Sequence, residues 1–95
     1  MADRLTDDAV REALASLPSW SLESGKLHRE FRFADFSEAL GFLVRVGIEA
    51  EKRNHHPEIA NVYASVTIDL TTHDAGGITE KDVDLARAID ALAGD

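Results

Sequence analysis

The sequence EIANVYASVTIDLTT, residues 58–72, decides the fold class of this chain. From Ser65 onward, apolar and polar residues alternate, which is the two-residue period of a strand with one buried face. The apolar positions are Val66, Ile68 and Leu70. A tight turn near Ala64 would join this strand to an earlier one from Glu58 to Tyr63. Strands joined by so short a turn pair antiparallel, so the stretch predicts a β-hairpin.

A long helix is predicted before this hairpin and a shorter one after it. Asp35 with Glu38 three residues later is typical of a helix start, and the apolar pattern continues to about Arg53. The apolar residues cover more than half of the helix circumference and are Phe36, Ala39, Leu40, Phe42, Leu43, Val44 and Val46. One face should pack on a sheet, and the surplus predicts contact with a partner chain. Thr79 with Asp82 predicts the start of the last helix.

The first 33 residues supply another helix and another hairpin. Thr6 is the expected cap of the helix, and Ser24-Gly25 is the expected turn before a strand at residues 26–33. Arg29 is the one mismatch on the apolar side of that strand. The order α-β-β-α-β-β-α predicts an α+β fold, in which three helices cover one face of a four-stranded antiparallel sheet.

Length, charge and composition narrow the range of possible functions. Ninety-five residues make one domain, residues 1–95. The net charge of −8 repels phosphate backbones, so direct nucleic-acid binding is not expected. The chain has no cysteine, which excludes disulfides and thiolate nucleophiles. The acidic N-terminus does not resemble a signal peptide and no apolar run is long enough to cross a membrane, so we expect a cytoplasmic location.

Three of the four histidines fall within residues 51–82, together with the carboxylates of Glu51 and Asp82 and the phenol of Tyr63. Histidine can give or take a proton near neutral pH. The candidate site residues are Glu51, His55, His56, Pro57, Tyr63, His73 and Asp82. They lie at predicted ends of helices and strands, and such ends gather at one rim of a small layered fold. The sequence therefore predicts a site for proton transfer around one small ligand.

Several of these residues also have a simpler explanation. Asp82 would be needed in any case as the third residue of a helix capping box. Glu51 can pair with a neighbouring cation on a solvated helix end, and Tyr63 can pack within the hairpin. His28, the fourth histidine, is expected to be an exposed strand residue. Only in combination do the candidate residues indicate a function.

A metal site is the rival interpretation. Zinc sites often use two histidines four residues apart on a helix, and no such pair exists here. The adjacent His55 and His56 chelate poorly because neighbouring side chains in extended backbone point apart. A site built from His55, His73 and a carboxylate stays open as an alternative. Neither a Gly-x-Ser-x-Gly nucleophile elbow nor a glycine-rich phosphate loop is present.

The spacing of the candidate residues resembles that of the pterin-4a-carbinolamine dehydratase family. The family pattern is an acidic or similar residue, three positions, His-His-Pro, five positions, an aromatic residue, nine positions, a histidine and then an aspartate. Every element has its counterpart here, in Glu51, His55-His56-Pro57, Tyr63, His73 and Asp82. The segment from Gly41 to Val46 also looks like part of the family's central helix. The resemblance covers nearly the whole chain.

This resemblance implies dehydration of 4a-hydroxytetrahydropterin to quinonoid dihydropterin, a step that recycles the cofactor of aromatic amino acid hydroxylases. It implies that no metal and no organic cofactor are needed. His55 and His73 would be the acid/base pair, and His56 would hold the pterin and its leaving hydroxyl. The substrate-binding residues would be Glu51, Pro57, Tyr63 and Asp82.

Two positions depart from the family pattern. Ile59 stands where a tryptophan is common, and Asn54 stands where an acidic residue is common. We expect these departures to change affinity or rate. Some family members also dimerise and stabilise a transcription factor, and others resemble assembly proteins, so a non-catalytic dimerisation or assembly factor on the same scaffold is the alternative function. In either case we expect a homodimer or homotetramer.

Overall fold

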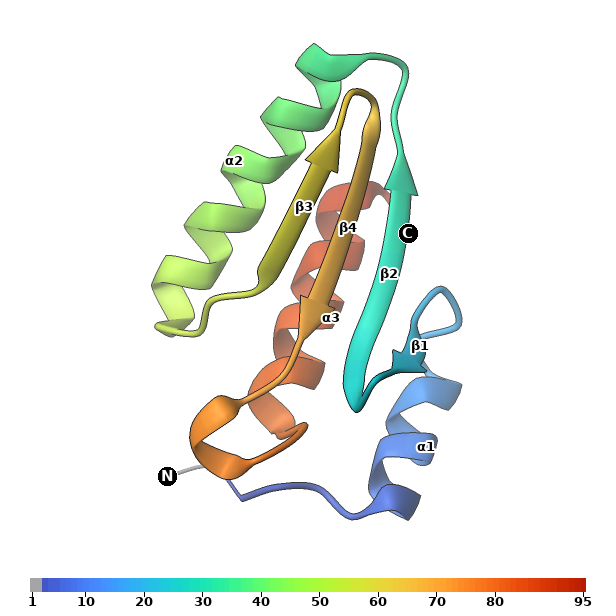
Figure 1. The fold of residues 1–95 in the computed structure, drawn as a ribbon, viewed down its shortest axis with the longest axis vertical. Helices are drawn as coiled ribbons and strands as arrows, with labels where there is room; N and C mark the ends of the chain where they lie inside the picture. Colours follow the sequence, from blue (N-terminus) through green and yellow to red (C-terminus); the bar gives the residue numbers. More distant parts are fainter. Residues whose placement is uncertain (1–2) are drawn as a thin grey trace.

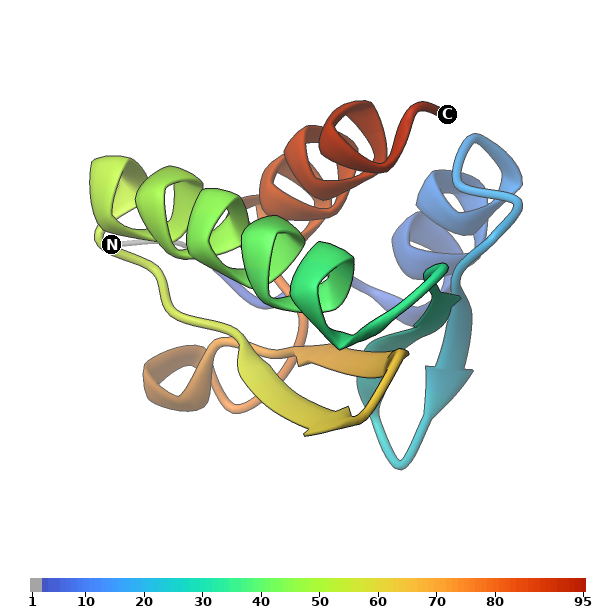
Figure 2. The same cartoon turned by 90° about the horizontal axis from the view of Figure 1, so that it is seen from above.

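The computed structural model describes residues 3–95 and has the predicted order of elements (Figure 1). The helices are α1 (Asp7–Ala15), α2 (Phe36–Arg53) and α3 (Glu80–Ala93), with a short 3-10 helix η1 (His73–Ala75). The strands are β1 (Ser21–Glu23), β2 (Lys26–Arg32), β3 (Glu58–Val62) and β4 (Ser65–Leu70). They form one antiparallel sheet in the order β1-β2-β4-β3. The three helices cover one face of this sheet (Figure 2), which confirms the predicted α+β fold.

Both hairpins turn through residues with left-handed backbone conformation. Ser24 (φ 52°) and Gly25 (φ 76°) connect β1 to β2, and Tyr63 (φ 54°) with Ala64 connects β3 to β4. The strand register leaves two residues in each turn. The Ser24-Gly25 turn is as predicted, whereas the strand predicted to reach Tyr63 ends at Val62, and Tyr63 belongs to the turn. Glycine tolerates this conformation easily, whereas a bulky residue such as tyrosine rarely adopts it.

The core lies between the sheet and the helices. In β4 the predicted alternation is confirmed, since Val66, Ile68 and Leu70 are fully buried. Only one of the apolar faces of α2 packs into this core, through Ala39, Phe42, Val46 and Ala50. The other face stays exposed and consists of Phe36, Leu40, Val44 and Ile48. Within residues 3–95, neither α2 nor any other helix has the length and apolarity to cross a bilayer.

Arg29 breaks the alternation of β2 because it makes ion pairs on the core side of the sheet. Its guanidinium lies 2.5 Å from Asp90 of α3 and 2.5 Å from Asp95, and it stacks over the Phe31 ring at 4.3 Å. Trp20 Nε1 donates to the same Asp90 carboxylate at 2.7 Å. A charge this deep in the fold needs such partners. The mismatch in the sequence is therefore the contact that fastens β2 to the end of α3.

Candidate active site

Two segments, residues 54–57 and 71–79, carry all three predicted site histidines and leave the sheet at the same end. Glu58 at the start of β3 pairs with Asp69 near the end of β4, so the chain enters β3 beside the place where it leaves β4 (Figure 1). The last turn of α2 and the first turn of α3 adjoin these segments in sequence. The predicted rim therefore forms at this end of the sheet.

The end of α2 decides which of the adjacent histidines faces inward. Asn54 adopts the left-handed conformation (φ 47°), which asparagine tolerates better than most residues. The backbone N–H of His55 then donates to the carbonyl of Ala50 at 3.1 Å. The His55 side chain is only 10% exposed, whereas that of His56 is 59% exposed. The expected divergence of the two neighbours is confirmed.

His55 is bound to a buried carboxylate. Its Nε2 lies 2.5 Å from Oδ1 of Asp82, whose side chain is fully buried in the first turn of α3. Oδ2 of Asp82 accepts hydrogen bonds from the backbone N–H of Thr79 at 2.9 Å and from Oγ1 of Thr72 at 2.8 Å. Asp82 thus completes the predicted capping box of α3 and also holds the imidazole. One carboxylate therefore serves both as part of the helix cap and as the partner of His55.

Thr72 is a site residue that the sequence analysis missed. Its Oγ1 lies 2.8 Å from Oγ1 of Thr79, and both threonines are buried. The predicted strand to Thr72 is too long, because β4 ends at Leu70 and Thr72 forms an isolated bridge with Gly77. The signal was available, since Thr72 continues the inward-facing positions of β4 and is polar. A polar residue in a buried register needs a partner, and Asp82 is that partner.

Glu51 contacts His56 rather than His55. Its Oε1 lies 2.5 Å from Nε2 of His56, at the surface. Glu51 and His55 are four residues apart, a spacing that predicts neighbours on one face of a continuous helix, and that prediction is wrong. The reason is local, since α2 ends at Arg53 and the left-handed turn at Asn54 takes the following residues out of helical register.

His73 is the most exposed of the three histidines, with 78% of its side chain accessible. It begins η1, and its Nε2 lies 3.6 Å from Oε2 of Glu58. The loop that carries it is closed by the bridge from Thr72 to Gly77. His73 directly follows Thr72 in the sequence. Thr72 binds Asp82, and Asp82 binds His55. The site therefore combines one buried, fixed imidazole with one exposed imidazole close to Glu58.

Pro57 and Tyr63 lie at opposite ends of β3. Pro57 directly precedes the strand and is half-buried beside the histidine pair. Tyr63 is in the turn that follows the strand and is 68% exposed. The expectation that Tyr63 lies at the same rim is not met within the single chain.

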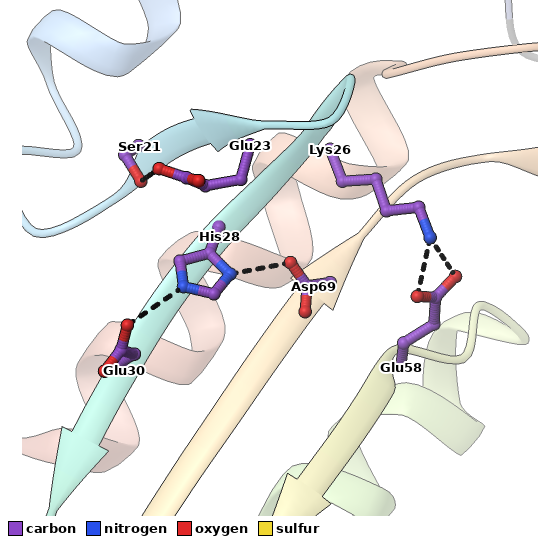
Figure 3. A network of polar contacts seen from close by, with 7 residues as sticks. All are labelled: Ser21, Glu23, Lys26, His28, Glu30, Glu58 and Asp69. Atoms are coloured by element: carbon purple, nitrogen blue, oxygen red, sulfur yellow. Dashed lines mark hydrogen bonds and ion pairs between the residues drawn. The ribbon is translucent and has the colours of Figure 1, made fainter.

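The fourth histidine lies on the open face of the sheet, in the row of paired residues that also holds Asp69 and Glu58 (Figure 3). Its side chain is 21% exposed, so it is more covered than predicted. His28 Nδ1 is 2.8 Å from Oδ1 of Asp69, and its Nε2 is 3.3 Å from Glu30. The hydrogen bond to Asp69 is the main cause that raises the pKa of His28 above its ordinary value of 6.5. In the same view, Lys26 Nζ donates to both oxygens of Glu58, at 2.7 and 2.9 Å.

The raised pKa of His28 predicts a pH-dependent part of the stability. A histidine whose pKa is higher in the folded state stabilises that state fully below about pH 6.5, and this contribution is lost as the pH rises through the folded-state pKa. We expect His28→Gln to lower the free energy of unfolding more at about pH 6 than at about pH 9. Urea unfolding at both pH values measures this, and an equal loss at both would contradict it.

One hollow of about 320 Å³ lies near the site but does not contain it. It is formed by the N-terminal segment, the β1–β2 turn and the end of the 73–78 loop, and its lining includes Arg4, Arg11, Leu22 and Gly77. None of the predicted site residues lines it. Within residues 3–95, no group of three or more His, Asp or Glu side chains is placed to hold a metal ion.

Comparison with known sequences points to one family. A family model described as pterin 4 alpha carbinolamine dehydratase matches residues 3–92. A protein of Solibacter usitatus whose name places it in that family is 53% identical over 93 residues, which cover 98% of each chain. Another from Rhodopseudomonas palustris (strain BisB18) is 54% identical over 95 residues, covering 98% of this chain and 94% of the relative.

Two solved structures have the same fold. A transcriptional coactivator/pterin dehydratase from Brucella melitensis matches with a TM-score of 0.93 and 42% identity, over 97% of this chain and all of that chain. A pterin dehydratase-like protein identified as a RuBisCO assembly factor in the alpha-carboxysome matches with a TM-score of 0.70 and 28% identity. That second match covers 81% of this chain and 92% of the other.

Proposed function

The chain belongs to the pterin-4a-carbinolamine dehydratase family, and from that premise we propose that it converts 4a-hydroxytetrahydropterin to quinonoid dihydropterin by histidine acid/base catalysis. The observation that carries the mechanism is the buried contact of His55 with Asp82, at the rim that His56 and His73 share. An imidazole held by a carboxylate on one nitrogen can exchange a proton on the other. A cytoplasmic location stays a prediction.

The reaction needs an acid and a base at the same time. The 4a-hydroxyl leaves as water only when it receives a proton as the C–O bond breaks. A ring N–H of the pterin loses its proton in the same step, so substrate becomes product plus water with no net change in protons on the protein. Each positioned group contributes about 10²–10⁴ to the rate.

The geometry supports different roles for the histidines. His55 is fixed in direction and is suited to remove or return a proton at one defined point. His73 is exposed and free to approach the leaving hydroxyl as the acid. His56, steadied by Glu51, would hold the pterin at the mouth of the site. Roles for Pro57 and Tyr63 rest on the family pattern alone and stay predictions.

An assay with the substrate itself tests this function. The 4a-hydroxytetrahydropterin is generated chemically, and its loss is followed by absorbance with and without the protein. Catalysis at micromolar protein or below supports the proposal, and a rate equal to the spontaneous one refutes it. Running the same assay with the tetrahydrobiopterin derivative and with pterins of other side chains identifies the preferred substrate.

An assembly factor is the alternative, because one structural relative has that role. The buried pair of His55 and Asp82 argues for the dehydratase. Burying a carboxylate against an imidazole is usually no more stable than an apolar pair of similar volume. A protein that only binds a partner gains nothing from keeping His55 and His73 at one rim. Retained binding of a partner by a His55→Ala, His73→Ala double variant, with no dehydration by the wild type, would favour the alternative.

We also propose that the chain is a homo-oligomer, assembled through the exposed apolar face of α2. Phe36, Leu40, Val44 and Ile48 are each 43% to 64% exposed and follow one another at four-residue spacing along one side of the helix. Such a stripe is typical of a helix that packs on another helix. The edge strand β3, with Val62 exposed, offers a second surface. Two separate surfaces are what a tetramer requires.

Light scattering tests the oligomeric state. We expect a dimer or tetramer at micromolar concentration, and a smaller assembly after Val44→Asp, because an aspartate would be buried without a partner in the interface. Lys52→Gln, an exposed change on the same helix, is the matched control and should leave the mass unchanged. A monomeric wild type would end this proposal.

A further inference from the structure

A chain of buried hydrogen bonds runs from the backbone of α3 to the imidazole of His55. The backbone N–H of Lys81 donates to Oγ1 of Thr79 at 3.2 Å, and Oγ1 of Thr79 lies 2.8 Å from Oγ1 of Thr72. Oγ1 of Thr72 lies 2.8 Å from Oδ2 of Asp82, whose Oδ1 lies 2.5 Å from Nε2 of His55. The four side chains that these hydrogen bonds join are all buried, namely those of Thr79, Thr72, Asp82 and His55.

The two threonine hydroxyls can satisfy these hydrogen bonds with only one assignment of donors and acceptors. Thr72 has a single hydroxyl proton, and when it goes to Asp82, Thr79 must donate to Thr72. In the opposite direction Thr79 would face two donors, from Thr72 and from the backbone of Lys81, and its own proton would have no acceptor among residues 3–95. A buried hydroxyl without an acceptor is unfavourable. The first direction therefore applies, and it points every donor toward Asp82.

The direction of these hydrogen bonds fixes which nitrogen of the His55 imidazole carries the proton. The Asp82 carboxylate already accepts hydrogen bonds from the Thr72 hydroxyl and the Thr79 backbone, so it presents an acceptor to His55 as well. With Asp82 acting as the acceptor toward all of its neighbours, the proton shared with His55 belongs to Nε2. We infer that Thr72 and Thr79 are positioning residues that keep neutral His55 in the Nε2–H form, so that Nδ1 is the atom that exchanges a proton with the pterin.

Nδ1 is free for that exchange. No residue within 3–95 forms a hydrogen bond with it, and in the same part of the chain no buried side-chain nitrogen or oxygen lacks a partner. Nδ1 must therefore reach the surface even though most of the ring is covered. In the neutral form it carries a lone pair, which makes His55 the base and leaves the acid role to His73. This assignment of base and acid rests on the proposed function, whereas the position of the proton does not.

Nitrogen NMR of histidine-labelled protein reads the proton position directly. At a pH where His55 is neutral, with the signal assigned by comparison with His55→Ala, we expect a protonated-type shift for Nε2 and an unprotonated-type shift for Nδ1. The opposite pattern would overturn the inference whatever the activity. The expected pattern in a protein without dehydratase activity would refute the proposed function and leave the tautomer standing.

Thr72→Val and Thr72→Ser form the matched pair of variants. Valine has the shape of threonine without the donor, so we expect kcat to fall about 10- to 100-fold with little change in KM, because the buried Thr72 acts on His55 through Asp82. The His55 nitrogen shifts should move toward a mixture of the two tautomers, because one donor instead of two then holds Oδ2 of Asp82, and the bond from Oδ1 to Nε2 loosens. Serine keeps the hydroxyl and should restore both the rate and the shifts. Equal rates and shifts in the two variants would show that Thr72 does not position His55.

Discussion

Replacing His55 with alanine is expected to lower the rate of dehydration by about 10²–10⁴. The substitution removes the imidazole that we propose exchanges the proton, and it leaves the other residues of the proposed site in place. The fold should persist, because Asp82 keeps its bonds to Thr72 and to the backbone of Thr79 and still caps α3. Steady-state kinetics with chemically generated substrate gives the rate, and circular dichroism with thermal unfolding verifies the fold.

His28→Ala is the control for His55→Ala. It removes the same side chain from the open face of the sheet, where Asp69 and Glu30 are its contacts, and turnover should stay close to that of the wild type. His73→Ala should also lower the rate, since the acid is lost. Wild-type turnover in the His55→Ala, His73→Ala double variant would refute the assignment of catalysis to these histidines.

The fold could be predicted because its strongest signals are local. The alternation of residues 65–70, the Ser24-Gly25 turn and the caps at Thr6, Asp35 and Thr79 each depend on neighbours in sequence. Arg29 shows where such signals end. Its place on the core side of β2 is explained only by the carboxylates of Asp90 and Asp95, which lie more than sixty residues further along the chain.

The site was only partly predictable for the same reason. The spacing identified the three histidines and Asp82, but it could not give their partners. The left-handed backbone of Asn54 takes the following residues out of helical register, so that Glu51 contacts His56 and not His55. That conformation also gives a structural reason for an asparagine where the family pattern often has an acidic residue. Which face of α2 packs on the sheet was equally undetermined, since both of its faces are apolar.

Asp82→Asn is expected to reduce kcat by a factor approaching that of His55→Ala, within about 10²–10⁴. Both oxygens of Asp82 face donors, so the amide nitrogen of asparagine must oppose one of them. The backbone N–H of Thr79 cannot become an acceptor, whereas the imidazole can. The amide nitrogen therefore turns to His55, Nε2 becomes the acceptor and the proton moves to Nδ1. The analogous substitution in the serine protease triad lowers kcat about 10⁴-fold through the wrong tautomer.

Asp84→Asn is the matched control for Asp82→Asn, because it makes the same change two residues further along α3. Asp84 is exposed and pairs with Arg53 at 2.7 Å, so its loss should change stability by less than about 1 kcal/mol and leave kcat unchanged. Kinetics and nitrogen NMR on both variants separate two explanations of any loss in Asp82→Asn. A large loss of kcat with the proton now on Nδ1 supports His55 as a base that acts through that atom. Near-normal kcat with the proton on Nδ1 would refute it, because the lone pair that accepts the pterin proton would then be dispensable.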